Sequence, residues 1–256
     1  MGQYKKFWYL LVAVLIGAFS ILGYYGFEVY REAPPIPQQY VSEQGEKVIT
    51  HDEILHGQTA WQSTGGMQLG SVWGHGAYQA PDWTADWLHR ELTNWLDIEA
   101  QKDYSKPFAD LNEEQQTLLK ARLTREYRGS RVDENGTVVL SNTRLAAIEK
   151  TAAYYISLYG DDPATKVTRK HFAMKDNTLP NLQARQDLTK FFFWTAWTAS
   201  AERPNTHASY TNNWPHEPLI NNVPTPENVV WSIASVVFLI AGIGFVVWIW
   251  SFKKRQ

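Results

Sequence analysis

Cysteine is absent from the 256 residues of the chain. Without thiols the chain can form no disulfide bond, and it cannot attach a c-type haem, which needs two cysteine sulfurs for its thioether bonds and a histidine for its iron. A large charge of either sign is also missing, because the formal net charge at neutral pH is −2. With no basic stripe, nucleic acid is not an expected partner. The stability of the fold must therefore come from packing.

Charged side chains are also missing from two long apolar runs, Phe7 to Phe27 and Val229 to Phe252. At ~1.5 Å of rise per residue, a helix of either length can cross the ~30 Å hydrocarbon layer of a membrane. A cleaved signal peptide is the alternative for the first run, but the run is too long and no small-x-small cleavage pattern follows it. A buried soluble helix is the alternative for the second, but such helices rarely run this far without one charge. We therefore predict two transmembrane helices.

Basic residues flank both runs. Lys5 and Lys6 precede the first, while Lys253, Lys254 and Arg255 follow the second. The positive-inside rule then places both chain ends in the cytoplasm and the intervening segment outside. The predicted organisation is a cytoplasmic N-terminus at 1–6, a transmembrane helix at 7–29, an outer domain at 30–228, a transmembrane helix at 229–252 and a cytoplasmic end at 253–256.

The outer segment is predicted to be mainly helical. Apolar side chains recur at spacings of three and four, and capping residues or glycines stand near the ends of the periodic stretches. A proline-rich stretch at 32–39 predicts an extended linker. The Asn-Gly pair within Asp133 to Gly136 favours a tight turn, so we predict a small β-hairpin between Val132 and Leu140. The predicted helices span residues 52–61, 81–104, 111–127, 142–159 and 180–201.

A motif in two halves is the most informative feature of the chain. Gly57-Gln-Thr-Ala-Trp61 is followed by Gly74-His-Gly-Ala-Tyr78-Gln-Ala-Pro81-Asp82. This pattern resembles the cytochrome c subunit of bacterial nitric oxide reductases, whose frame is G-x-x-x-W, then C-x-x-C-H, then G-x-G-A-Y-x-A-P-[DE]. In that frame Gly66, Leu69 and Gly70 stand where the two cysteines and the histidine would be, so the haem c motif is lost. The combination looks like the N-terminal region of quinol-dependent nitric oxide reductase, which implies a cytochrome c-like domain without haem.

A second block is similar to the same family. Trp194-Thr-Ala-Trp197 and Ser209 to Pro215 stand shortly before the second apolar run, as they do in the quinol-dependent enzymes. The resemblance implies a partner: a haem-copper-oxidase-like bundle of twelve further membrane helices that binds haem b, haem b3 and a non-haem iron. Quinol would supply electrons to the full enzyme, and the chain would lie among the lipids of the bacterial inner membrane with its outer domain in the periplasm. The chain would then be a piece of the enzyme, inactive by itself.

The resemblance also implies a cation. In the cytochrome-dependent relatives, backbone carbonyls of the G-A-Y segment help to bind a calcium ion between this domain and the haem propionates of the catalytic subunit. The matching positions are Gly76 and Tyr78. The alternative is that the block is only a close-packed turn that docks on the bundle. The seven histidines are predicted to have surface or hydrogen-bonding roles, because no two have metal-ligand spacing on a predicted helix.

Loss of a haem would leave a large void, and voids cost stability at ~24 cal/mol per Å³. Bulky side chains near the altered motif are expected to fill it, and at least two of them should pack together beneath residues 66–70. The candidates are Trp61, Met67, Trp73 and Trp87. Met67 and Met174 could each suggest an axial sulfur ligand of a haem, but without an attached haem both are predicted to be core residues.

An alternative function comes from a different class. A self-contained protein with two membrane spans could use its outer domain to bind a partner or a small ligand, as sensors and assembly factors do. The same apolar runs and helical outer domain would serve that function. Further apolar spans bearing histidines beyond Gln256 would distinguish the reductase from this alternative.

Overall fold

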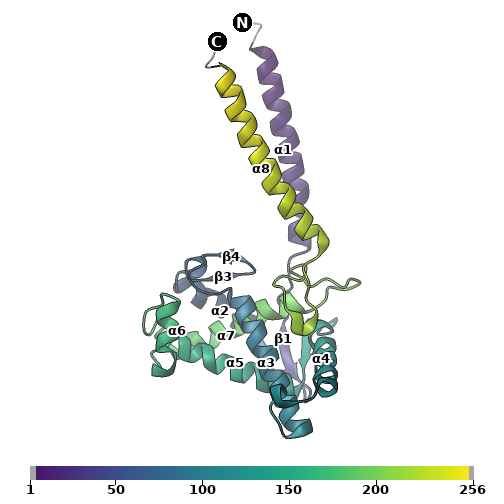
Figure 1. Cartoon of the computed structure of the whole chain (residues 1–256), viewed down its shortest axis with the longest axis vertical. Coiled ribbons are helices and arrows are strands. Elements are labelled where there is room, and N and C mark those ends of the chain that lie inside the picture. Colours follow the sequence, from purple (N-terminus) through teal and green to yellow (C-terminus); the bar gives the residue numbers. More distant parts are fainter. Residues whose placement is uncertain (1–3, 254–256) are drawn as a thin grey trace. The chain divides into compact units, whose positions relative to one another are not determined.

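The structure is a computed structural model that describes residues 4–253. It divides into two units, one that ends at Pro35 and one that begins at Ile36. The first contains α1 (Lys5–Arg31), a helix with no buried residue. The last helix of the second is α8 (Pro226–Lys253). Both are long and apolar enough to cross a membrane, which confirms the predicted helical conformation of the two apolar runs (Figure 1).

The remaining helices of the second unit follow the predicted order. Short polar side chains begin five of them: the side chains of Thr50, Asp82, Asn112, Ser141 and Asn181 each accept a hydrogen bond from a backbone N–H in the first turn. Such caps satisfy donors that a helix start leaves unpaired. These helices confirm the five predicted ones to within three residues at each end, and α6 is an addition to them. Their bounds are α2 His51–Ser63, α3 Trp83–Tyr104, α4 Glu113–Arg128, α5 Asn142–Leu158, α6 Lys166–His171 and α7 Leu182–Ser200.

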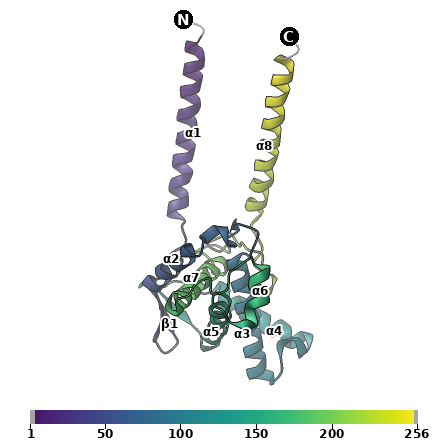
Figure 2. The same ribbon diagram turned by 90° about the vertical axis from the view of Figure 1, so that its left-hand side faces the viewer.

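Helix α7 lies at the centre of the domain. Every residue from Phe191 to Ser200 is buried, and the helix contacts α2, α3, α4 and α5 (Figure 2). Over residues 191–200 the helix is covered on all sides and has no polar face, which explains why aromatic and small residues occupy these positions. Its hydroxyl groups bond to the helix itself: Thr195 Oγ1 donates to the Phe192 carbonyl at 2.8 Å and Thr198 Oγ1 to the Thr195 carbonyl at 2.7 Å.

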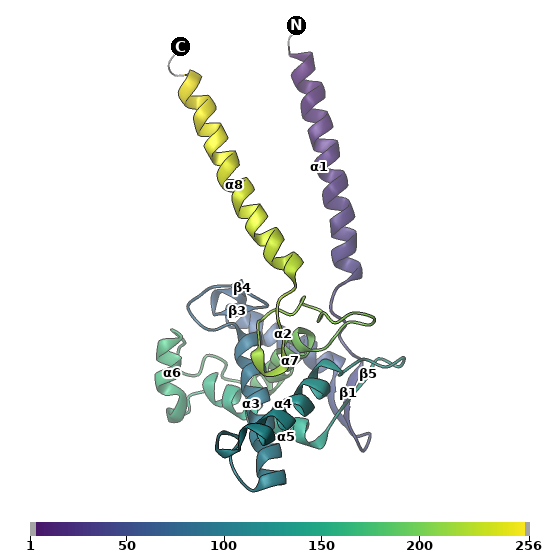
Figure 3. The same cartoon turned by 45° about the vertical axis from the view of Figure 1, so that its right-hand side comes forward.

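The predicted hairpin between Val132 and Leu140 is wrong. Its turn forms, since the backbone N–H of Gly136 donates to the Asp133 carbonyl at 3.0 Å, but Val132 lies outside any strand. Instead β5 (Thr137–Leu140) pairs in parallel with β1 (Gln39–Ser42) (Figure 3). This pairing places buried Val138 and Leu140 in register with β1 and its fully buried Tyr40, a gain that a solvent-facing hairpin would lack.

The small β-hairpins of the fold lie elsewhere. One is formed by β1 and β2 (Lys47–Thr50), and the other by β3 (Ser71–Val72) and β4 (His75–Gly76). The second follows a short 3-10 turn, η1 (Gly66–Gln68). Three further 3-10 turns are η2 Phe108–Asp110, η3 Pro163–Thr165 and η4 Pro218–Ile220. The mainly α fold with small antiparallel elements between two apolar helices is therefore confirmed.

Candidate functional site

The first half of the sequence motif packs α2 onto α7. A side chain at Gly57 would overlap with the backbone carbonyl of Asp187, so only glycine allows the two helices to approach this closely. One turn later Trp61 is buried, and its ring centroid lies 5.5 Å from that of Phe191. The G-x-x-x-W pattern thus has a packing role.

The second half of the motif is a loop tied to the start of α3. Asp82 Oδ2 accepts hydrogen bonds from the Ser71 hydroxyl at 2.8 Å and from the backbone N–H of Gly74 at 2.6 Å. Its other oxygen, Oδ1, accepts the N–H of Ala85 at 3.0 Å and so caps α3. One carboxylate therefore fixes both the β3–β4 hairpin and the helix that follows.

The attachment block, residues 66–70, is where the family frame would place a haem. Gly70, which the resemblance aligns with the iron-binding histidine, has a φ of +79°. A Cβ added there would lie 2.5 Å from Nε1 of Trp83 and 2.6 Å from the carbonyl oxygen of Pro81. That same Nε1 donates a hydrogen bond to the Leu69 carbonyl at 2.7 Å. Trp83 therefore closes the space into which a histidine at position 70 would project.

Trp83 is not among the expected void-filling residues. It is fully buried, and its ring stacks on Phe192 of α7 with centroids 5.6 Å apart and an interplanar angle of 16°. Trp83 directly follows Asp82, the last residue of the motif. This proximity to the motif is the sequence signal that could have identified Trp83 as a void-filling residue. Its ring also lies near those of Tyr155, Tyr159 and Phe172.

The expected void-filling residues meet different outcomes. Trp61 and Trp87 are buried, and Trp73 is partly buried against the same core. Trp73 donates from Nε1 to the Thr195 carbonyl at 3.1 Å, and Trp61 and Trp73 each contact α7 aromatic rings. The prediction for Met67 is wrong, because this side chain is 54% exposed.

The core prediction for Met174 is confirmed, since that residue is 8% exposed. All seven histidines are exposed or partly exposed, as predicted. Their polar ring contacts include those of His75 Nδ1, which lies 2.9 Å from the Trp73 carbonyl, and of His89 Nδ1, which lies 3.0 Å from Glu217 Oε2.

The positions expected to contact calcium lie on the surface. Gly76 in β4 is exposed, and the side chain of Tyr78 is 100% exposed. Across residues 4–253, no three His, Asp or Glu side chains stand close enough to bind a metal ion together. Backbone carbonyls are acceptable calcium ligands, but two of them are too few for the six to eight oxygens that the ion takes. Any calcium here needs further oxygens, from water or from a partner.

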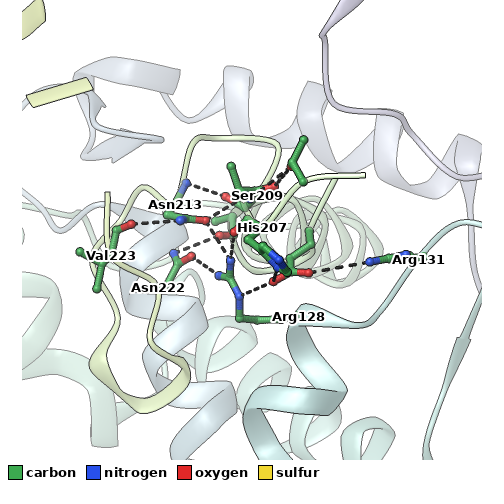
Figure 4. A network of polar contacts seen from close by, with 11 residues as sticks. Arg128, Arg131, His207, Ser209, Asn213, Asn222 and Val223 are labelled. Atoms are coloured by element: carbon green, nitrogen blue, oxygen red, sulfur yellow. Dashed lines mark hydrogen bonds and ion pairs between the residues drawn. The ribbon is translucent and has the colours of Figure 1, made fainter. Parts of the chain in front are cut away.

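A polar clamp holds the loop that leads to α8 (Figure 4). Arg128, the last residue of α4, donates from Nε to Glu202 Oε1 at 3.0 Å and from Nη1 to Asn222 Oδ1 at 2.8 Å. Its Nη2 donates to Asn213 Oδ1 at 3.2 Å and to the His207 carbonyl. We call these five residues the Arg128 clamp. Because the side chain of Arg128 is only 11% exposed, these charged hydrogen bonds are shielded from water.

The asparagines of the clamp extend it through the loop. Asn222 Nδ2 donates to the carbonyls of Ala199 at 3.0 Å and Pro215 at 2.7 Å, and Asn213 Nδ2 donates to Val223 at 3.0 Å (Figure 4). A segment with little regular structure thus has its backbone fixed by side chains. No local sequence signal marks this role of Arg128, because its partners lie far along the chain.

The chain was compared with known proteins in two ways. A search of curated proteins found no match to the chain. The family model for the cytochrome c-like domain of the nitric oxide reductase NorB matches residues 37–216, which is more than half of the chain and includes the motif, the attachment block and most of the Arg128 clamp. The chain therefore belongs to the family of NorB cytochrome c-like domains of nitric oxide reductases.

Proposed function

We propose that this chain is the non-catalytic, membrane-anchored part of a quinol-dependent nitric oxide reductase. The complete enzyme would combine two molecules of nitric oxide with two electrons and two protons to give nitrous oxide and water. The main observation that supports this proposal is the contact of Trp83 with Gly70 in a chain that has no cysteine. A domain with no haem c cannot pass electrons on from a soluble cytochrome, which agrees with the quinol donor that the resemblance to the quinol-dependent enzymes implies.

The role of the domain in this proposal is to anchor and cap the catalytic bundle. Both apolar helices lack histidine, so they offer no imidazole to a b-type haem. Haem b, haem b3 and the non-haem iron would lie in the bundle, where they supply the redox chemistry. The carbonyls of Gly76 and Tyr78 would add calcium ligands at the interface, with the remaining oxygens from the partner.

The location follows from the charged flanks of the apolar helices. We place both chain ends in the cytoplasm of a bacterium and residues 30–228 in the periplasm, because lysine and arginine gather at the two ends. A phosphatase reporter that is active only in the periplasm should work when inserted beside Gly136 and fail when fused after Gln256. Activity of the second fusion would contradict this topology.

The electron donor is tested on the native complex, isolated from membranes through a tag on this chain. We expect nitric oxide consumption with a reduced quinol analogue, none with reduced cytochrome c, and no haem stain on this chain after denaturation. A cytochrome c-dependent reductase isolated in the same way is the control, and it should show the opposite donor preference. Consumption driven by cytochrome c, or a haem that survives denaturation on this chain, would refute the proposal.

A further inference from the structure

A cavity of about 420 Å³ lies beside the C-terminal end of α4, away from the attachment block. Its volume falls within the range of roughly 300–1,000 Å³ that is usual for small-molecule sites. Three arginines line it, Arg125, Arg131 and Arg144, together with Ser130 from the turn between them. Such a concentration of guanidinium groups around one cavity points to an anionic ligand.

Arg144 is the unusual member of this set. Its side chain is 2% exposed, its Nε donates to Glu91 Oε1 at 3.1 Å, and its guanidinium carbon lies 4.0 Å above the ring of Tyr127. Its Nη1 is buried and has no hydrogen-bond partner within residues 4–253. Burial of a charged donor without an acceptor costs more free energy than burial of a neutral one. Nη1 of Arg144 therefore needs an acceptor that the protein itself does not supply.

Glu91 is the charge partner of Arg144 and contacts it through Oε1. It is 1% exposed, and burial raises the pKa of its carboxyl group, although Arg144 and the indole N–H of Trp87 act in the opposite direction. One of its oxygens, Oε2, already accepts that indole N–H at 2.7 Å. The Arg144 guanidinium therefore keeps donor capacity on the side away from Glu91.

Two carboxylates also line the cavity, but both are occupied. Glu126 accepts the Trp95 indole N–H at 3.0 Å on Oε2 and the Ser141 hydroxyl at 2.6 Å on Oε1. Asp133 Oδ1 accepts backbone N–H groups of Asn135 at 2.9 Å and Thr137 at 2.7 Å. These carboxylates organise the walls, and together with Glu91, which pairs with Arg144, they balance the three arginines, so the cavity attracts an anion through the donors of Arg125 and Arg131 and not through a net positive charge.

Ser130 adds a neutral donor. It is buried, and its Oγ accepts the Trp197 indole N–H at 3.2 Å, which leaves its own O–H available. Arg125 and Arg131 are exposed, and Arg131 Nη2 lies 3.8 Å from Glu202, too far for a close hydrogen bond. The lining thus offers a buried cation, a hydroxyl and two accessible cations.

We propose that this cavity is a binding site for a small oxyanion, a phosphate or carboxylate group, held by Arg144 at its base and by Arg125 and Arg131 at its rim. Guanidinium groups match such oxygens in pairs of parallel hydrogen bonds. The oxyanion binds Arg125 and Arg131 in their present positions, and it satisfies Nη1 of Arg144 only after the side chains that enclose this atom shift. This site is separate from the attachment block and does not depend on the electron donor of the enzyme.

Inorganic phosphate is the probe. The full chain in detergent is titrated with phosphate at constant ionic strength, with chloride as the reference anion, and the melting of its outer domain is followed. A ligand that binds only the folded state raises the melting temperature in a saturable way. We expect this rise with phosphate and not with chloride. The same titration in anionic-lipid nanodiscs distinguishes a lipid headgroup from a soluble ligand. If the site binds a lipid headgroup, the headgroup already occupies it and added phosphate has no effect. If the site binds a soluble ligand, the response to phosphate is the same as in detergent.

Variants assign the response to the cavity. Arg125→Gln combined with Arg131→Gln should weaken the apparent affinity for phosphate by about tenfold, since two charge-assisted contacts are lost. Glu91→Gln combined with Arg144→Met removes the buried pair together, avoids an isolated buried charge and should abolish the response. Arg122→Gln is the matched control, because Arg122 lies on the same helix α4, pairs with Asp103 at 2.7 Å and does not line the cavity. Equal effects of phosphate and chloride, or parent-like affinity in the rim double variant, would overturn the proposal.

Discussion

Substitution of Gly70 by alanine tests the closed attachment block most directly. The added Cβ would lie 2.5 Å from Nε1 of Trp83 and 2.6 Å from the Pro81 carbonyl, below the 3.0 Å that real Cβ contacts respect. Trp83 cannot move away freely, because its ring stacks on Phe192 and its Nε1 is bonded to the Leu69 carbonyl. The strain must therefore appear as lost stability.

The magnitude has two parts. A left-handed backbone costs a residue with a Cβ roughly 1–2 kcal/mol, and overpacking of a filled core costs roughly 1–3 kcal/mol. Together they lower the free energy of unfolding by about 2–5 kcal/mol. Natural domains have only ~5–15 kcal/mol in total, so the variant should unfold at clearly lower denaturant concentration.

Gly45 provides the matched control. Its φ of +82° is close to that of Gly70, but an added Cβ would meet nothing within 4 Å. Gly45→Ala should therefore show only the backbone part of the cost. Urea unfolding of both variants in detergent, followed by tryptophan fluorescence, measures the difference. If Gly70→Ala lost no more stability than Gly45→Ala, the block would have room for a side chain, and the argument against haem attachment would rest on the missing cysteines alone.

Three further predictions concern the core, the Arg128 clamp and acid stability. Trp83→Ala should lower the free energy of unfolding by ~3–5 kcal/mol, and Trp73→Ala should lower it less because Trp73 is only partly buried; equal losses in urea unfolding would contradict the central place of Trp83. Arg128→Met should lower the local stability of the 201–225 loop by about 2–4 kcal/mol. Arg128→Lys should lower it by a similar amount, because an ammonium group cannot bind several acceptors in one plane. Unchanged hydrogen exchange of the loop amides in these variants would contradict the role of the Arg128 clamp. Partial burial alone would raise the pKa of Glu53, but hydrogen bonds from Lys190 and the Thr50 cap hold that pKa below its usual 4.5. The Glu53 carboxylate therefore stabilises the fold above pH 4.5, and this stabilisation is lost as the pH falls through the lowered pKa. Glu53→Gln should make the melting temperature less dependent on pH on the acid side. A pH profile like that of the parent would contradict this.

Local sequence is enough to predict most of the helices. Capping residues such as Asp82 and Ser141 act on N–H groups in the following turn, and apolar spacing of three and four defines a helix face over neighbouring residues. The start of α2 at His51 depends on the capping box of Thr50 with Glu53, a local signal that the predicted start at residue 52 does not use. Helix existence is therefore more predictable than helix boundaries.

Strand pairing is not predictable from the same signals. The Asn-Gly turn forms, but β5 pairs with β1, almost a hundred residues earlier in the chain. A parallel pairing has no connecting turn that could announce it in the sequence. Its stabilisation comes from burial of Val138 and Leu140, which depends on where the rest of the domain lies.

The sequence by itself determined the two apolar helices, the mainly helical domain between them and the impossibility of a thioether-linked haem, because length, spacing and the absence of cysteine are local or countable properties. Only the tertiary structure decided what closes residues 66–70 and what holds the loop before α8. Trp83 closes the attachment block because α7 supports its ring, and Arg128 reaches acceptors more than seventy residues away. Close packing and charged hydrogen bonds of this kind arise between segments that no sequence window contains together.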